Sequence, residues 1–395
     1  MKICMLAYAH YINDARIKCY VRTLEANGHS VDVVALRSDG EAATEARPSG
    51  TIFRVMDKYQ GQSSAKYVWS YLKFFLKALF FFLRRPRYDV VHVHNMPNAL
   101  VFAAIGPKLF GARVMLDVHD LMMANYMAKF GTAEGGLVLK VLKLEQRLSG
   151  MFADHVFCAD HNQKDYLAEH CGIARDKITV LLNLPNEEIF KPVAAVKKSD
   201  VFRIVYHGTL AHRLGIDLIL RAVARAAERV PVELYLYGAG DYLADALDLS
   251  AQLKLDQIVH FSRNFFPVEQ IPQMVCGMDL GIVGNRRNPA CDKYMLPVKL
   301  LEYAYLGIPV VAPRLEVIER YFDDTMVRYY EPENVEQMAD AIVELVDGPE
   351  KRERQARAAS AFYQKYNIKA QSDRYLNLLT ASPLPMRVRP AERQL

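Results

Sequence analysis

The segment at residues 291–313 reads CDKYMLPVKLLEYAYLGIPVVAP and carries the clearest chemical pattern in the chain. It predicts a helix over Pro297–Leu306, in which Glu302 is a charged residue among apolar neighbours. The first turn of a helix offers unpaired backbone N–H groups and a positive dipole end. Lys299 adds a cation there, so this turn can bind a phosphate group. Glu302, one turn further on, could accept hydrogen bonds from both hydroxyls of a ribose.

The same spacing permits a simpler interpretation of Glu302. Lys299 stands three residues before it, and oppositely charged residues at this separation often pair on a helix surface. The spacing by itself leaves a nucleoside-diphosphate site and a surface ion pair equally open.

Polar residues also stand where other predicted strands end. His119 directly follows the predicted strand Val114–Val118, and His94 and Asn95 lie at the end of the strand before it. Ligands of parallel sheets bind outside the carboxyl ends of the strands. We therefore place His119 in the expected cleft and treat His94 and Asn95 as acceptor-side candidates. Two other histidines, His92 and His207, are interpreted as structural.

Short apolar runs alternate with amphipathic segments along the whole chain, as in parallel sheets covered by helices on both faces. In the first half, the predicted strands are Ile3–Ala9, Val31–Leu36, Val90–His94, Val114–Val118 and His155–Cys158. In the second half, they are Phe202–Tyr206, Glu233–Tyr237, Val259–Phe261, Leu280–Val283 and Val310–Ala312. Amphipathic helices are predicted at Ala15–Asn27 and Gly215–Val230. The fold class is therefore α/β, with two doubly wound domains that face one another across a cleft.

The polar stretch NLPNEEIFKPVAAVKKSD, which ends at Asp200 and contains two prolines, predicts a linker between the domains. The predicted boundaries are 1–184 for the first domain, 185–200 for the linker, 201–365 for the second domain, 366–380 for a helix that can cross back to the first domain, and 381–395 for a disordered basic tail.

Composition limits the functional classes. Of 395 residues, 51% are hydrophobic and 24% are charged, which is typical of a globular protein. The net charge of +5 permits nucleotide phosphates or acidic lipid as partners, whereas nucleic-acid binding would need a concentrated basic patch. The six cysteines form no C-x-x-C pair, so we interpret them as reduced thiols of a cytosolic protein. The N-terminal apolar run is interpreted as a strand rather than a secretory signal.

Residues 66–85 read KYVWSYLKFFLKALFFFLRR and have an unusual aromatic and basic composition. At about 100° per residue, the basic residues of this stretch fall on one narrow helical stripe. The uninterrupted apolar runs are far shorter than the roughly 20 residues that cross a bilayer. The stretch is either a buried helix whose lysines reach solvent, or a helix lying in the membrane interface, which we prefer. The predicted membrane contacts are Lys66, Trp69, Lys73, Lys77 and Arg84.

Read in order, segments along nearly the whole chain resemble the retaining glycosyltransferases of family 4. They are NDARIKCYVRTLEANGHSVDVVAL, YDVVHVHN, RVMLDVHD, ADHVFCAD, KITVLLNLPNEEIF, VYHGTLAHRLGIDLILRAV and the pattern P-x-K-x-x-E-Y-x-x-x-G-x-P-V-V. The resemblance implies the GT-B fold, with two Rossmann-like domains, and transfer of a sugar from a nucleotide donor with retention at the anomeric carbon. It also implies that Glu302 binds the donor ribose, that the backbone of Leu296–Lys299 holds the diphosphate, and that His119 contacts the donor sugar.

The chain departs from the family pattern at positions near the expected site. Tyr294 stands where many members have a second Glu near the donor sugar, and Asp292 is a candidate substitute. Thr209 replaces the Arg that often follows Gly208, so we assign Arg213 to the diphosphate.

The glycine of the first loop is missing as well, which makes Asp14 and Arg16 candidates on the acceptor side or at the diphosphate. The predicted catalytic residues are thus His119, Arg213 and Lys299. The predicted donor-binding residues are Glu302, Leu296, Pro297, Val298, Tyr294, Gly208 and Arg263. The predicted acceptor-side residues are Asp14, Arg16, His94 and Asn95.

The expected donor is a UDP- or GDP-linked sugar, bound as a substrate, with no other cofactor. No metal site is expected, because the chain has no D-x-D motif and the cations and helix dipole can neutralise the diphosphate. The expected acceptor is a glycan or lipid-linked saccharide of a surface polysaccharide or glycolipid, reached from the cytoplasmic side of a membrane; no nucleic acid is expected as a partner. The alternatives are a GT-B sugar-nucleotide epimerase and a non-catalytic relative, which the loss of the second Glu favours. A dehydrogenase is disfavoured, because Gly238-Ala239-Gly240 lacks the third glycine of the dinucleotide fingerprint.

Overall fold

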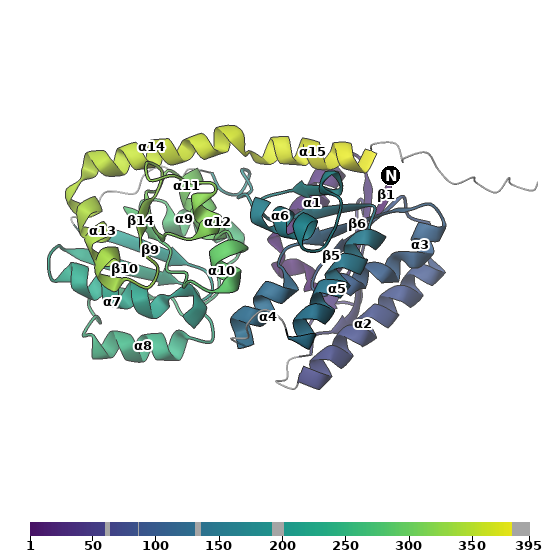
Figure 1. The fold of residues 1–395 in the computed structure, drawn as a ribbon, viewed down its shortest axis with the longest axis horizontal. Helices are drawn as coiled ribbons and strands as arrows, with labels where there is room; N and C mark the ends of the chain where they lie inside the picture. Colours follow the sequence, from purple (N-terminus) through teal and green to yellow (C-terminus); the bar gives the residue numbers. More distant parts are fainter. Residues whose placement is uncertain (60–63, 86, 131–135, 192–200, 381–395) are drawn as a thin grey trace, which may run out of the picture.

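The computed structural model describes residues 1–59, 64–85, 87–130, 136–191 and 201–380. Two α/β domains lie side by side (Figure 1). The first is built on an eight-stranded sheet in the order β3-β4-β2-β1-β5-β6-β7-β8, parallel throughout except that β3 runs antiparallel to β4. Its strands are β1 (Lys2–His10), β2 (Ser30–Arg37), β3 (Thr44–Arg47), β4 (Gly50–Asp57), β5 (Val90–His94), β6 (Arg113–Val118), β7 (His155–Cys158) and β8 (Ile178–Val180).

Helices cover both faces of this first sheet, because alternate residues of its central strands are apolar on both sides. Cys4, Leu6 and Tyr8 of β1 pack towards one helix layer, whereas Ile3 and Met5 pack towards the other. The helices are α1 (Ala15–Ala26), α2 (Ser64–Arg84), α3 (Ile105–Leu109), α4 (Met122–Phe130), α5 (Leu137–Phe152), α6 (His161–Glu169) and the 3-10 segment η2 (Asn98–Ala104).

The second domain has a six-stranded, parallel sheet in the order β11-β10-β9-β12-β13-β14. Its strands are β9 (Phe202–His207), β10 (Val232–Tyr237), β11 (Val259–Phe261), β12 (Leu280–Ile282), β13 (Val310–Pro313) and β14 (Arg328–Tyr330). Its helices are α7 (Ile216–Ala227), α8 (Leu243–Gln252), α9 (Ile271–Val275), α10 (Pro289–Lys293), α11 (Val298–Tyr305), α12 (Glu316–Glu319), α13 (Val335–Asp347) and α14 (Pro349–Lys365). Two parallel doubly wound sheets confirm the predicted fold class.

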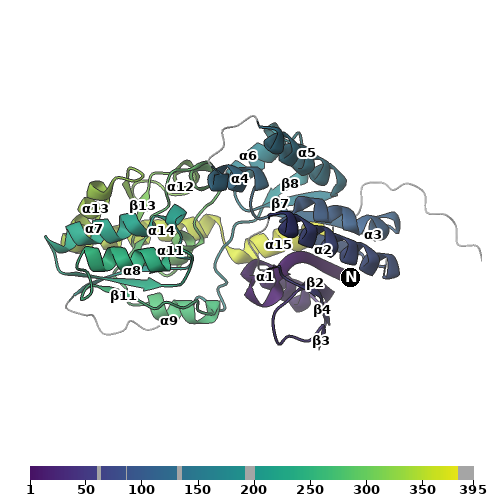
Figure 2. The same cartoon turned by 90° about the horizontal axis from the view of Figure 1, so that it is seen from below.

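The last helix, α15 (Ile368–Thr380), returns to the first domain. Figure 1 shows α14 on the second domain and α15 continuing over the first, and Figure 2 shows α15 beside α1. The side chains of Tyr375 and Leu379 are buried in the core of the first domain, with Val21 of α1. Arg113 Nη1 donates to the carbonyl of Leu378 at 2.7 Å, so β6 holds the end of the helix as well.

A second contact between the domains is formed by the start of α6. The side chain of Asn162 donates to the carbonyl of Lys293 at 2.8 Å, and that of Gln163 donates to the carbonyl of Tyr294 at 2.9 Å. Arg320 pairs with Asp165 at 2.6 Å. The cleft is therefore bounded by polar contacts at α6 and by the packing of α15.

The structure differs from the sequence predictions in two places, and parts of two predicted segments lie outside the described residues. The hairpin of β3 and β4 was not predicted, because its strands are short or half-exposed and lack a continuous apolar run. The predicted linker is not polar throughout, since Phe190 packs in the core. Residues 192–200 of that linker and the predicted tail at 381–395 are outside the described part of the chain.

Candidate active site

In the second sheet, the chain adds β10 and β11 on one side of β9 and the later strands on the other side. The point between β9 and β12 is therefore the topological switch point, where doubly wound sheets bind ligands. Gly208 directly follows β9 and has a φ of +110°, a conformation that L side chains rarely adopt. A Cβ added to Gly238, after β10, would lie 1.8 Å from the carbonyl oxygen of Gly208, so the two loops pack backbone to backbone. A Cβ on Gly208 would lie 3.8 Å from Cε of Lys299. The first strand of this sheet therefore ends against the predicted phosphate-binding turn.

Helix α11 begins at Val298, as the sequence pattern indicated, and no side chain caps its first turn. Leu296 and Pro297 are buried, whereas Val298 is 40% exposed and lines the cavity between the domains. The N–H groups of this turn therefore face the cleft without a side-chain partner.

The ammonium of Lys299 lies beside an aromatic ring and next to Gly208. Nζ is 3.3 Å from the hydroxyl of Tyr206 and 4.3 Å from the centre of its ring. Burial lowers the pKa of Lys299 to about 8, although Glu302 acts in the opposite direction. Nζ is thus a cation near neutral pH with no carboxylate partner among the ion pairs of the described residues, and an anionic ligand would stabilise its charged form.

Glu302 is bound by a residue from another part of the chain, and not by Lys299. Its Oε2 lies 2.5 Å from Nε2 of His207, at the end of β9. His207 Nδ1 is 2.9 Å from the hydroxyl of Tyr303, which donates to the carbonyl of Val205 at 3.1 Å. The surface ion pair left open by the spacing is therefore not formed, and Glu302 is held at the edge of the cavity, where a ribose could reach it.

Two predicted cations of the donor side are exposed. Arg213 lies in the 3-10 turn η4 (His212–Leu214), with Nη1 3.5 Å from the sulfur of Met295. Its charge contributes to the lowered pKa of Lys299, as expected for neighbouring cations. Arg263 follows β11 with a φ of 61°, beside Ser262, whose hydroxyl accepts from the N–H of Gly238 at 2.9 Å. Both arginines are available to an anionic ligand.

The observed contacts of Tyr294 and Asp292 are with residues other than Lys299 and Glu302. The ring of Tyr294 packs edge-on against that of Tyr166 at 5.5 Å, and its carbonyl accepts from Gln163, so it is part of the domain contact. Asp292 Oδ1 accepts from the N–H of Glu316 at the start of α12. In this arrangement, neither side chain takes the place of the missing second Glu.

In the first domain, a buried ion pair lies at the carboxyl end of β6. Arg16 of α1 binds both carboxylate oxygens of Asp117, at 2.8 and 2.7 Å. Its Nη1 donates to the carbonyl of Leu181 at 2.7 Å and to the side chain of Asn183 at 2.8 Å. Burial by itself would raise the pKa of Asp117, but the charges of Arg16 and His119 hold it well below its usual value.

His119 is positioned by this ion pair and by the loop after β5. Its Nε2 is 3.1 Å from Asp117 Oδ2 and 3.2 Å from Nδ1 of His94, and its backbone N–H donates to Oδ1 of Asn95 at 2.8 Å. Asn95 also donates to the carbonyl of Asp120 at 2.7 Å. His94 is buried, which lowers its pKa. His94 and Asn95 therefore contact His119 rather than open solvent.

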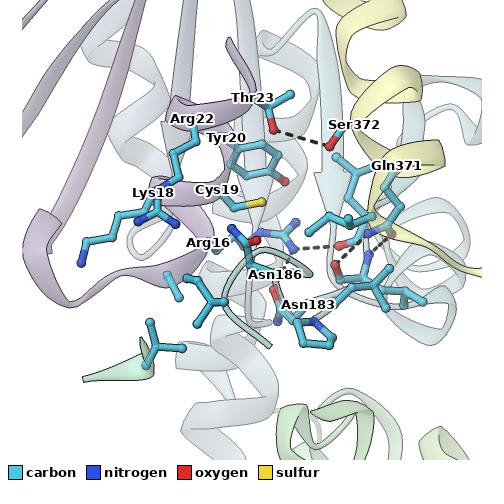
Figure 3. A pocket seen from close by; sticks show the side chains of 18 of the residues that line it. Arg16, Lys18, Cys19, Tyr20, Arg22, Thr23, Asn183, Asn186, Gln371 and Ser372 are labelled. Atoms are coloured by element: carbon cyan, nitrogen blue, oxygen red, sulfur yellow. Dashed lines mark hydrogen bonds between the residues drawn. The ribbon is translucent and has the colours of Figure 1, made fainter. Parts of the chain in front are cut away.

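Asp14 and Arg16, which we predicted on the acceptor side, have partners inside the protein. Asp14 caps α1, because its Oδ1 accepts from the N–H of Ile17 at 2.9 Å. Arg16 lines the cavity, but Asp117 and two further acceptors already bind its guanidinium (Figure 3). Their observed interactions are structural.

His92, His94 and Asp117 bring potential metal-ligand atoms within 4.8 Å of one another. Arg16 already supplies a cation to both oxygens of Asp117, and Nδ1 of His92 lies 2.9 Å from the hydroxyl of Tyr375. A second cation in this buried space would repel the guanidinium, so the cluster does not fit a metal ion.

A cavity of about 280 Å³ lies between the two halves of the site. Helix α1, the segment 181–190 and α15 contribute to its wall, and Figure 3 shows Asn183, Gln371 and Ser372 lining it. His119 from the first domain and Glu302 from the second both line it. The two predicted key residues therefore share one cavity, although they stand on different domains.

The predicted membrane-contact residues all lie on α2 and are exposed. Lys73 lies over the ring of Trp69, with Nζ 5.6 Å from its centre, whereas Nζ of Lys77 donates to the carbonyl of Val55 at 2.9 Å. None of the helices in the described residues combines the length and apolarity needed to cross a bilayer.

Comparison with protein families matches both domains. The model of glycosyltransferase family 4 matches residues 17–184, and the model of the glycosyl transferases of group 1 matches residues 201–348. The chain belongs to glycosyltransferase family 4. This confirms the resemblance seen in the sequence, over both Rossmann-like domains.

The chain is also similar to curated relatives and to solved structures. The chain is 25% identical over 260 residues to the chitobiosyldiphosphodolichol beta-mannosyltransferase of Debaryomyces hansenii, covering 58% of this chain and 54% of the relative. It spans about half the length of most of the curated relatives it matches.

The sucrose-phosphate synthase of Thermosynechococcus elongatus superposes with a TM-score of 0.78 at 17% identity, covering 97% of this chain and all of that one. HepE of Anabaena, solved in complex with UDP-glucose, superposes with a TM-score of 0.71 at 13% identity, with 97% and 100% covered. These likenesses confirm the GT-B fold.

Two residues of the candidate site were not recognised as such in the sequence. His207 was interpreted as structural, yet it directly contacts Glu302, and its place at the end of β9 next to Gly208 was the available signal. Asp117 was not named, because a buried aspartate inside an apolar strand gives no local sign of its partner. The partner, Arg16, is 101 residues away in the chain.

Proposed function

We propose that this protein is a retaining glycosyltransferase that moves a sugar from a nucleoside-diphosphate donor to a saccharide acceptor. The observation that carries the proposal is the arrangement of Lys299, Glu302 and the uncapped start of α11 beside Gly208, at the switch point of the second sheet. His119 lines the same cavity from the other domain. This arrangement holds a nucleotide on one side and a reacting sugar on the other.

Stabilisation of the leaving group is the main chemical task of such a site. Breaking the bond between the anomeric carbon and the diphosphate oxygen builds negative charge on the diphosphate. Lys299, Arg213 and the N–H groups of α11 are fixed cations and dipoles that would stabilise this charge in the transition state. They supply positive charge without a metal ion, so we propose metal-independent catalysis.

Retention enters the proposal from the family resemblance, and the partners of two carboxylates of the site, Asp117 and Glu302, bear on how it is achieved. A retaining glycosidase uses one of two closely spaced carboxylates as its nucleophile. Asp117 is bound by Arg16 and His119, and Glu302 is bound by His207, so both carboxylates have other tasks. We therefore propose attack of the acceptor on the same face of the sugar as the departing diphosphate, with a diphosphate oxygen accepting the acceptor proton.

For the acceptor, we propose a lipid-linked saccharide, as in the assembly of a surface polysaccharide or glycolipid. The name of the Debaryomyces hansenii relative describes transfer to a dolichol-diphosphate-linked sugar. The exposed aromatic and basic side chains of α2 support a peripheral position at the cytoplasmic face of a membrane. The six free cysteines are consistent with a reducing compartment.

The first test is a thermal-shift titration with UDP, GDP and ADP, each with and without magnesium. We expect one nucleotide to stabilise the wild type without magnesium, and Glu302→Gln to lose that stabilisation while its melting temperature without ligand stays similar. Glu316→Gln, on the surface helix α12, is the matched control. If no nucleotide stabilises the wild type, the donor site is wrong.

Turnover is tested with the nucleotide sugar so identified. We expect nucleotide to be released only when a saccharide acceptor is present. NMR of the product should show the same anomeric configuration at the transferred sugar as in the donor. Release without acceptor, together with an epimerised sugar, would show an epimerase, and binding without turnover would show a non-catalytic relative.

A further inference from the structure

Helix α2 presents exposed apolar side chains in addition to its buried ones. Phe74 and Phe82 face the core and are fully buried. On the outer side, Val68 is 67% exposed, Phe80 is 55% exposed and Leu83 is 56% exposed. The helix is therefore anchored in the core on one side and exposes a row of apolar side chains to water on the other. Hydration of this row is unfavourable unless another surface covers it.

Two further helices carry similar outer rows. On α5, Leu137, Val141, Leu144 and Leu148 recur at helical spacing and are all exposed, by 47% to 78%. The end of α3 and the residue after it, Leu109 and Phe110, are 81% and 73% exposed. We call the exposed apolar side chains of α2, α3 and α5 the apolar face.

These rows lie on the same side of the first domain. The segment η2 contacts α2, α3 and α5, and α2 contacts α3 directly (Figure 1). Side chains of η2 and α2 pack in the same core as Leu6 of β1, so these segments form one layer over one face of the sheet. The outer rows of helices in one layer point away from the sheet together. The apolar face is thus one surface built from segments between residues 64 and 152.

The exposed charges carried by the three helices have one sign, although Lys108 of α3 pairs with Asp154, two residues after α5, at 2.6 Å. Helix α5 carries Lys140, Lys143 and Arg147 among its exposed residues, next to the basic stripe of α2. The only acidic residue within the three helices is Glu145. Its carboxylate is turned inward, accepting from the side chain of Asn98 at 2.8 Å and from the N–H of Ala99. The face therefore offers an apolar centre with a cationic rim and no exposed carboxylate on these helices.

We propose that the apolar face of α2, α3 and α5 is the surface on which this protein docks to an anionic lipid bilayer. Leucine, phenylalanine and tryptophan beside lysine and arginine are the composition of helices that lie in a membrane interface. Lysine is depleted in protein–protein interfaces, which disfavours a protein partner for a surface with a lysine on each helix. Anionic headgroups would meet the cationic rim, and acyl chains would meet the apolar centre.

The proposal deepens the proposed function, on which its link to the acceptor rests. Helix α5 contacts α4, which begins three residues after His119. A bilayer on the apolar face would therefore lie beside the first-domain wall of the cleft. A lipid-linked saccharide could enter from that side without leaving the membrane.

The test is flotation of the full-length protein with vesicles of phosphatidylcholine alone and of phosphatidylcholine mixed with phosphatidylglycerol. We expect binding to the mixed vesicles, weakened about tenfold or more in Leu109→Ser/Phe110→Ser, which removes two side chains that are not in the core. Lys143→Glu/Arg147→Glu should weaken binding about tenfold or more at low salt, and only to the mixed vesicles.

Two matched controls accompany these variants. Phe265→Ser removes a side chain that is 65% exposed on the other domain, and Arg354→Glu reverses an exposed charge of α14. Both should bind vesicles as the wild type does. The thermal shift by nucleotide, measured without vesicles, should be unchanged in the variants of the apolar face.

The outcomes separate this proposal from the proposed function. Absence of wild-type binding to mixed vesicles, or equal binding by the variants of the apolar face, would overturn the docking surface even if a nucleotide binds. A wild-type dimer that these variants dissociate, without vesicle binding, would show an interface between copies of the chain. Vesicle binding through the apolar face without any nucleotide binding would uphold the docking surface and refute the proposed function.

Discussion

The two halves of the cleft differ in how many of their charged groups already have partners inside the protein. In the first domain, Arg16 and Asp117 satisfy one another, and both also contact other residues. In the second domain, the ammonium of Lys299 lies beside the hydroxyl and ring of Tyr206 and has no ion-pair partner among the described residues. A closed network holds a side chain in place, whereas an unpaired cation is available to a ligand. In our proposal, the first domain orients His119 and the second binds the anionic donor.

The largest effect is expected from breaking the closed network. Arg16→Met leaves the carboxylate of Asp117 buried without a cation, which should lower the free energy of unfolding by about 3–5 kcal/mol. Urea denaturation measures the change, and Arg22→Met on the exposed side of the same helix is the control. Recovery of most of the loss in Arg16→Met/Asp117→Leu is expected. A loss below about 1 kcal/mol in the single variant would contradict a network essential to the fold.

The next effect concerns the unpaired cation. Lys299→Met keeps most of the length of the side chain and removes its charge, so transfer should slow about 10²–10³-fold. The melting temperature at pH 7 should stay the same or rise, because burial disfavours the charged form. Wild-type affinity for the nucleoside diphosphate should fall as the pH rises through about 8, where Lys299 loses its proton. A similar pH dependence in Lys299→Met, measured by calorimetry, would refute this assignment.

Asp160 tests whether every buried carboxylate of the first domain has hydrogen-bond or ion-pair partners for both of its oxygens. It caps α6 through Oδ1, which accepts from the N–H of Gln163 at 2.8 Å, while Oδ2 is buried and has no hydrogen-bond partner among the described residues. Burial raises its pKa to about 7, so the ionised carboxylate is less favourable in the folded protein than in the unfolded chain. Asp160→Asn keeps the cap and should stabilise the protein by about 1–3 kcal/mol at pH 8.

The sign of this effect fixes its pH window. The folded-state pKa of Asp160 is above its unfolded value, so wild-type stability is lost as the pH rises from the unfolded pKa towards about 7. The advantage of the Asn variant should shrink on acidification and vanish near pH 4. Thermal denaturation at pH 4, 6 and 8 measures it, and an advantage independent of pH would contradict the buried-acid explanation.

The smallest effect is expected at His207, which positions Glu302 without reaching the ligand in our proposal. His207→Ala should raise the Kd for the nucleotide about tenfold, the loss expected for one charge-assisted hydrogen bond. His207→Gln places an amide N–H near the position of Nε2 and should restore most of the affinity. A structural role alone would lower the melting temperature in both variants without this difference in Kd.

Much of the fold followed from local pattern. The strand Val90–His94 and the helix that begins in the PVKLLEY segment were predicted with nearly their observed bounds, because apolar periodicity and flanking turn residues are local signals. The hairpin of β3 and β4 was missed, since Thr44–Arg47 is half-exposed to exposed and short. Its pairing depends on β4 lying beside β2 rather than on its own residues.

The site was predictable to the extent that its residues stand at element ends. Lys299 and Glu302 became candidates by their place in one helix, and His119 by its place after a strand; the family resemblance then decided between a ligand site and a structural role. Tyr294 and Asp292 were proposed near the donor sugar from their sequence positions alone. In the structure, Tyr294 lies in the contact between the domains and Asp292 binds the start of α12. Position along the chain does not report which way a side chain is turned once two domains meet.

The sequence by itself determined two doubly wound domains, the helix α11 with its candidate phosphate-binding turn, and the aromatic, basic helix α2. The tertiary structure decided which charges are satisfied, because Arg16 meets Asp117 and His207 meets Glu302 across separations of 101 and 95 residues. It also brought the outer rows of α3 and α5 beside that of α2. The physical reason is that hydrophobic periodicity depends on neighbouring residues in the sequence, whereas the partner of a buried charge depends on strand order and helix packing.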